Sequence, residues 1–206
     1  MLANNTGIKV GQLVGRFPGA LGHLYSPGAQ VGPYEFMPYA LDNGAYVAYK
    51  NGTTWDEAGW VSLLGWAAKA DVKPLWALVP DCVADRDETL RRWEKFYPAV
   101  KEFNFLPAFA VQDGMSVDDV PKEAAIVFVG GSTDWKWATL ENWGKNFPRV
   151  HVGRVNTYGK LVEAWKCGAE SCDGTGWLRG NKKQWAGLVD FLEGKHIYES
   201  FYKRFV

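Results

Sequence analysis

The sequence is poor in the residues that hold small domains together through disulfides or metal ions. Its three cysteines are Cys82, Cys167 and Cys172, and its three histidines are widely scattered. No CxxC pair and no HExxH motif occurs. We therefore expect neither a disulfide framework nor a metal site.

Net charge and long apolar runs are lacking as well. Lys and Arg together number 23, as do Asp and Glu, which argues against general polyanion coating but allows one local basic surface. No signal-peptide h-region or apolar run of membrane length occurs, so we expect a cytoplasmic protein with no membrane partner. No GxGxxG or GxxxxGK[ST] loop follows a predicted strand, which excludes the usual nucleotide-cofactor motifs.

The residues that are present predict one globular α/β domain over 1–206. Hydrophobic residues make up 47% of the chain, enough for a sizeable core. Strands are predicted at 8–15, 36–41, 74–79, 106–111, 125–129, 150–153 and 170–172. Helices are predicted from 53 or 54 to about 70, from 85 or 87 onward, and over 134–145, 158–167 and 181–193. This alternation predicts a compact (β/α) barrel of TIM type with its eighth strand missing or irregular, with an open doubly wound sheet as the alternative.

Five predicted strands end in a polar or glycine motif. These motifs occupy residues 41–46, 79–82, 111–114, 129–132 and 172–176. Because the carboxyl ends of parallel strands share one rim, Asp42, Asp81 and Asp173 are expected to converge there. Each aspartate taken singly is better explained as a turn residue, so the prediction of a site depends on their common register. Carboxylates that share a pocket shift each other's pKa values, so one can be ionised while another carries a proton.

The same rim carries groups that suit the edge of a purine. Gln112 offers an acceptor and donors, and Gly130 with Gly131 exposes bare backbone to a ligand. Guanine presents N1 and N2 as donors and O6 as an acceptor, which such groups complement. Tyr46 is placed to stack on a planar base, with ordinary core packing as the alternative.

The motifs in this order resemble the tRNA-guanine transglycosylase (queuine tRNA-ribosyltransferase) family. They are most similar to the compact phage-type members that insert 7-deazaguanines into DNA. The resemblance covers about residues 36–180. It is carried by residues 42–46, Asp81, 111–112, 130–131, 152–153 and Asp173.

The resemblance implies a role for each matching residue. Asp173 would be the nucleophile that attacks C1′ of the target nucleotide, and Asp42 would be the general acid/base. The purine edge would be held by Asp81, Gln112 and the Gly130–Gly131 backbone, with the ring between Tyr46 and Val152. Base exchange of this kind needs no cofactor.

Departures from the family pattern bear on the substrate. Family members that act on tRNA carry a zinc-binding insertion after the nucleophile strand, and nothing similar follows Asp173. We therefore expect DNA as the acceptor, with tRNA as the alternative and with room for a helper subunit. Ser-Gly-Gly after the first aspartate is replaced here by 43–45 (Asn-Gly-Ala), which would reshape that loop. A glutamate of the bacterial enzymes aligns with Lys136, which would disfavour a cationic aminomethyl group and favour 7-cyano-7-deazaguanine as the free base.

Basic and polar residues near the rim are candidates for nucleic-acid contacts. Arg154 and Asn156 follow the 150–153 strand, and Arg179, Lys182 and Lys183 follow Asp173. A solvated surface explains them equally well. Two further readings stay open at this stage: an N-glycosidase in which water replaces the incoming base, and a nucleobase or nucleic-acid binding module without catalysis.

Overall fold

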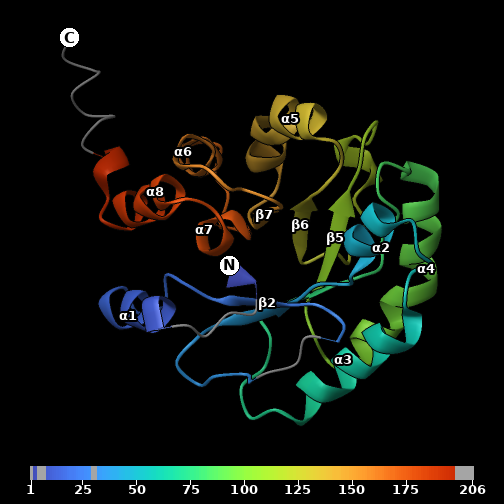
Figure 1. The fold of residues 1–206 in the computed structure, drawn as a ribbon. Coiled ribbons are helices and arrows are strands. Elements are labelled where there is room, and N and C mark those ends of the chain that lie inside the picture. The colour runs from blue at the N-terminus through green and yellow to red at the C-terminus, as the bar shows by residue number, and fades with distance from the viewer. Residues whose placement is uncertain (1, 4–7, 29–31, 198–206) are drawn as a thin grey trace.

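The computed structural model describes residues 2–3, 8–28 and 32–197, and these form an α/β fold around one parallel sheet (Figure 1). The sheet has eight strands in sequence order, each hydrogen-bonded in parallel to the next. The strands are β1 (Leu2–Ala3), β2 (His23–Tyr25), β3 (Tyr39–Leu41), β4 (Ala77–Leu78), β5 (Pro107–Val111), β6 (Ile126–Val129), β7 (Val150–Val152) and β8 (Ser171–Cys172).

Helices lie around this sheet, as Figure 1 shows. They are α1 (Ile8–Arg16), α2 (Ala45–Asn51), α3 (Glu57–Lys69), α4 (Arg86–Glu102), α5 (Thr133–Asn146), α6 (Tyr158–Lys166), α7 (Gly176–Arg179) and α8 (Lys182–Leu192). A 3₁₀ turn, Val117–Asp119, lies between β5 and β6. No helix in the described ranges combines the length and apolarity needed to cross a membrane.

The sheet has an apolar layer on each face. Along β5, Phe109 and Val111 belong to the cluster between the sheet and the helices, whereas Ala108 and Ala110 belong to a second cluster on the opposite face. This division follows from the alternation of side chains along a strand. Trp76 fills the second cluster, and its ring contacts the rings of Phe128 and His151 at centroid distances of 6.0 and 4.9 Å. The small alanine side chains on this inner face leave room for the Trp76 ring, so the sheet can curve around it.

Several expected elements are confirmed to within a few residues, among them β5, β6, β7, α5, α6 and α8. The capping residues are resolved as well. Asp85 caps α4 by accepting from Glu88 N at 2.9 Å, while Asp56 rather than Thr53 or Thr54 caps α3 by accepting from Gly59 N at 2.8 Å. The carboxylate of each cap satisfies a backbone N–H that has no partner within the helix.

The expected strand at 8–15 is wrong, because this segment is helix α1. Its buried residues Val10, Leu13 and Val14 recur at spacings of three and four, which places them on one helical face. Strand β1 was not foreseen, nor were β2, α2 and α7. The strand expected at 36–41 shrinks to β3, and the count of about seven strands becomes eight.

Candidate active site

A cavity of about 210 Å³ lies at the carboxyl ends of the strands. Its lining draws on the loops that follow strands β2 to β8, and its apolar side chains are Leu24, Val47, Leu78, Val83 and Phe128. The site residues predicted from the sequence that line the cavity are Asp42, Tyr46, Asp81, Gln112, Gly130, Gly131, Arg154, Asn156 and Asp173. The strand-end motifs thus meet in one place.

Asp81 is held by two side-chain amides. Asn43 Nδ2 donates to Asp81 Oδ1 and Gln112 Nε2 donates to Asp81 Oδ2, each at 2.6 Å. Burial raises the pKa of Asp81, although the hydrogen bond from Asn43 and the charge of Arg92 oppose this shift. Each carboxylate oxygen has capacity for a second hydrogen bond, so Asp81 can still accept from a ligand.

The orientation of the Gln112 amide is set by the backbone. Its Oε1 accepts from Ala84 N at 3.0 Å and from Gly131 N at 3.1 Å, so Nε2 must face Asp81. Gly130 allows this approach, because a Cβ there would lie 3.0 Å from Gln112 Nε2. Gly131 has a φ of +66°, a conformation that favours glycine. A Cβ at Gly131 would also lie 2.6 Å from Asp113 Oδ2 and 2.7 Å from the Trp135 ring, so the close packing of the loop favours glycine there.

Asp42 is a second carboxylate whose pKa is raised. Its Oδ2 accepts from Ser26 Oγ at 2.9 Å and its Oδ1 accepts from Asn43 N at 2.9 Å. Burial, together with the nearby charges of Asp173 and Asp81, raises the pKa of Asp42 to about 6 in spite of these bonds. Asp42 can therefore carry a proton near neutral pH.

Asp173 shows the opposite behaviour. Burial by itself would raise its pKa, but the hydrogen bonds from His151 Nε2 at 3.2 Å and Arg154 N at 3.1 Å help to bring it below the usual value. Both donors reach Oδ1, and no residue in the described part of the chain donates to Oδ2. Asp173 is thus an ionised carboxylate with one oxygen available.

Tyr46 and Arg154 form a stacked pair at the cavity wall. The guanidinium of Arg154 lies 4.6 Å from the centroid of the Tyr46 ring, and Arg154 also donates to the carbonyl of Gly131. Tyr46 is 41% exposed, so core packing does not explain it. Within the described ranges, no carboxylate forms a salt bridge with Arg154.

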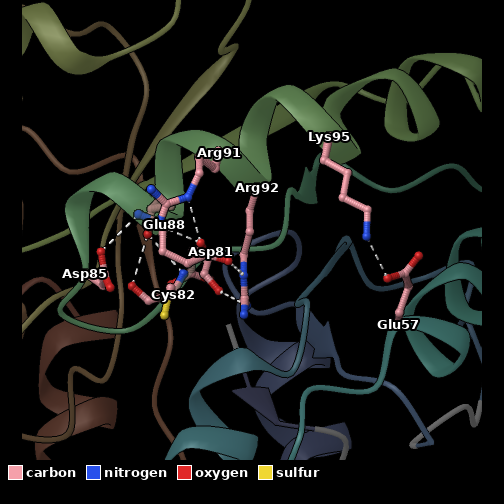
Figure 2. A network of polar contacts seen from close by, with 9 residues as sticks. Glu57, Asp81, Cys82, Asp85, Glu88, Arg91, Arg92 and Lys95 are labelled. Carbon is pink, nitrogen blue, oxygen red and sulfur yellow. Dashed lines mark hydrogen bonds and ion pairs between the residues drawn. The ribbon is translucent and has the colours of Figure 1, made fainter.

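Side chains of α4 hold the loop that presents Asp81, as Figure 2 shows. Arg92 donates to the backbone carbonyl of Asp81 at 2.7 Å and is itself paired with Glu88. The guanidinium of Arg92 also lies 5.6 Å from the ring of Trp55, whose Nε1 donates to Asn43 O. One arginine therefore links the loop of Asp81 to the loop of Asn43.

Two of the residues predicted to contact the base do not line the cavity. Val152 is fully buried in the cluster between sheet and helices, and the next residue, Gly153, faces the cavity instead. Lys136 is buried on α5, where it donates to Gly153 O. Burial and the charge of Arg154 lower the pKa of Lys136 to about 8. The expected contact of Lys136 with a base substituent is therefore corrected.

The three basic residues expected beyond Asp173 are exposed and lie outside the cavity. They are Arg179 on α7 and Lys182 and Lys183 on α8. Sequence reasoning missed three site residues: Ser26, Asn43 as a partner of Asp81, and His151. His151 lies two positions before Gly153, so the parity of the strand could have placed both on the inner face.

No known protein family matches this chain, and no curated protein is similar to it. Among the described residues there is no group of three or more His, Cys, Asp or Glu side chains suited to hold a metal ion.

Proposed function

We propose that this protein is a pentosyltransferase of the guanine-transglycosylase type, which replaces guanine in DNA with a free 7-deazaguanine base. The observation that carries the proposal is that Asp42 and Asp173 line one cavity, and that Asp173 has its Oδ1 held by His151 and Arg154 N while no described residue donates to its Oδ2. In these surroundings the pKa of Asp42 is raised to about 6, whereas the pKa of Asp173 is lowered below its usual value. Such a pair suits a proton donor beside an ionised nucleophile.

The reaction runs in two balanced steps. An oxygen of Asp173 forms a bond to C1′ while the bond from C1′ to N9 breaks, and its electron pair leaves with guanine, which takes a proton from Asp42. The incoming base then gives its N9 proton to Asp42 and attacks C1′, and the electron pair of the ester bond returns to Asp173. The intermediate is a covalent glycosyl ester, as in retaining glycosidases.

Recognition of the base is assigned to the amide-held carboxylate and its surroundings. Asp81 would accept from N1–H and N2–H of guanine, and Gln112 Nε2 retains a second N–H that can donate to O6. Tyr46 provides an aromatic face at the same wall. These groups suit a purine edge better than they suit a sugar, which favours base exchange over glycoside hydrolysis.

The preference for 7-cyano-7-deazaguanine now depends on Arg154 rather than on Lys136. The Arg154 guanidinium donates a hydrogen bond to the carbonyl of Gly131, and Arg154 lines the cavity. A cationic aminomethyl substituent beside this guanidinium would be repelled by its like charge. A nitrile nitrogen can instead accept a hydrogen bond from the guanidinium.

A compact (β/α) barrel of TIM type is part of the proposal. Its support is that the loops after β2 and β8 line the same cavity and that Arg16 of α1 pairs with Glu193, which follows α8, at 2.7 Å. This ion pair joins the last residue of α1 to the residue that follows α8. In such barrels the carboxyl ends of the strands carry the active site.

The test is incorporation of labelled guanine, in parallel, into duplex DNA, single-stranded DNA and unmodified tRNA. Asp173→Asn should abolish incorporation and trapping of the covalent intermediate. Asp134→Asn, an exposed aspartate on α5, is the matched control and should keep both. Label in tRNA alone would overturn the choice of DNA. Binding of nucleic acid without incorporation, unchanged in Asp173→Asn, would favour a non-catalytic binding module.

A further inference from the structure

His151 is the one described histidine in contact with the proposed nucleophile. Its ring is fully buried on β7 and packs against the rings of Trp76 and Phe128, at centroid distances of 4.9 and 4.8 Å. Nε2 lies 3.2 Å from Asp173 Oδ1, and Nδ1 lies 2.8 Å from Ser171 Oγ. A buried imidazole thus has a defined partner at each nitrogen.

The partners determine the tautomer. Burial lowers the pKa of His151, although the neighbouring Asp173 opposes this, and so favours the neutral ring with one N–H. An ionised Asp173 can only accept, and the proton must therefore be on Nε2. Nδ1 then accepts from the hydroxyl of Ser171. Ser171 and Asp173 are two positions apart, so the strand that presents the nucleophile also orients its donor.

Other charged and titratable groups also act on Asp173. Asp42 interacts with it from the loop after β3, and Lys136 interacts with it from α5. Arg154 donates its backbone N–H, and Cys172 is its neighbour in the chain. Glu170, before β8, acts on His151. Among the described side chains, only His151 makes a hydrogen bond to Asp173.

We propose that His151, with its tautomer fixed by Ser171, is a positioning residue for Asp173, and this inference rests on the proposed base exchange. The imidazole holds Oδ1 in place and leaves Oδ2 as the oxygen that attacks C1′. The hydrogen bond to Oδ1 strengthens whenever Asp173 regains its charge. His151 therefore assists the second step, in which the ester breaks and the carboxylate leaves.

The test compares three variants of the full chain. His151→Phe keeps a ring against Trp76 and Phe128 but removes both hydrogen bonds, whereas His151→Gln keeps an N–H donor. His23→Phe is the matched control, because His23 is also fully buried and its Nδ1 lies near a hydroxyl, that of Tyr25 at 3.1 Å. Melting temperatures of all three show the cost of losing a buried histidine.

Two readouts are measured. The first is the titration of the Asp173 carboxyl by ¹³C NMR in the free protein, with the resonance assigned through Asp173→Asn. His151→Phe should move this titration up by about one pH unit, because a donor to the ionised form is lost, while His23→Phe leaves it in place. The second is the rate of label incorporation, which should fall at least about tenfold in His151→Phe and be partly restored in His151→Gln.

The outcomes separate this inference from the proposed function. If the wild-type protein transfers no label but the Asp173 titration moves in His151→Phe, the base exchange fails and the pairing of His151 with Asp173 stands as a property of the fold. If the titration does not move in a folded His151→Phe, the inference is overturned, whatever the activity. Equal incorporation by His151→Phe and wild type would also overturn it.

Discussion

Replacing Asn43 by alanine should be among the most destabilising single changes at the cavity. Three buried groups depend on this amide: Asp81 Oδ1 and Val79 O accept from Nδ2 at 2.6 and 3.0 Å, and Ala45 N donates to Oδ1 at 2.8 Å. Each buried polar group left without a partner costs about 1–3 kcal/mol. Because water can enter the cavity and reach Asp81, we expect a total loss of about 3–5 kcal/mol in the free energy of unfolding.

The assay is urea unfolding followed by circular dichroism, with slopes compared so that midpoints report stability alone. Asn146→Ala is the control. Asn146 is exposed at the end of α5, and its loss should cost less than about 0.5 kcal/mol. Asn43→Asp adds a second test, because it places a carboxylate against Asp81. Its deficit should be largest near neutral pH and should shrink on acidification, when one of the two carboxyls binds a proton.

A loss below about 1 kcal/mol in Asn43→Ala, at an unchanged slope, would refute the assignment of these three bonds. A deficit of Asn43→Asp that is independent of pH would show that Asp81 does not face residue 43. Either result would also weaken the proposed recognition of the purine edge, since the position of Asp81 depends on this amide.

Three further predictions follow from the site. The raised pKa of Asp42 means that the native state holds its proton more tightly than the unfolded chain. The free energy of unfolding of wild type therefore falls as pH rises from about 4 to about 6, because Asp42 then ionises in the folded state. In calorimetry, Asp42→Asn should be up to about 3 kcal/mol more stable than wild type at pH 7, and this gain should be absent at pH 4. The same variant should lose base exchange. Gly131→Ala should lower the free energy of unfolding by about 1–3 kcal/mol and weaken base binding, because its Cβ would lie 2.6 Å from Asp113 Oδ2. Gly19→Ala is the control in the same unfolding assay. Gly19 has a φ of +77° and no atom within 4 Å of a Cβ, so this variant measures the backbone cost alone. Arg154→Ala should raise the turnover of an aminomethyl base relative to a nitrile base several-fold in competition assays; an unchanged ratio would remove Arg154 from substituent selection.

Much of the helix and strand order could be predicted, because the periodic patterns were long enough. The all-buried strand β5 and helix α5 stand close to their expected positions. The prediction of a strand over 8–15 is wrong because four apolar residues in a short segment do not distinguish a helix from a strand. Strand β2 was missed for the converse reason, since three residues are too few to show a period.

The convergence of Asp42, Asp81 and Asp173 was decided at the level of sequence, because parallel strands in order bring their carboxyl ends to one edge. Which neighbour each carboxylate meets was decided only by tertiary structure. Val152 and Gly153 differ by one position and so face opposite sides of the sheet, and Lys136 is turned inward to Gly153 O. A pKa responds to burial and to donors a few ångströms away. The contrast between a protonatable Asp42 and an ionised Asp173 therefore depends on the burial of Asp42 and on the hydrogen bond between His151 and Asp173, and both arise only in the folded protein.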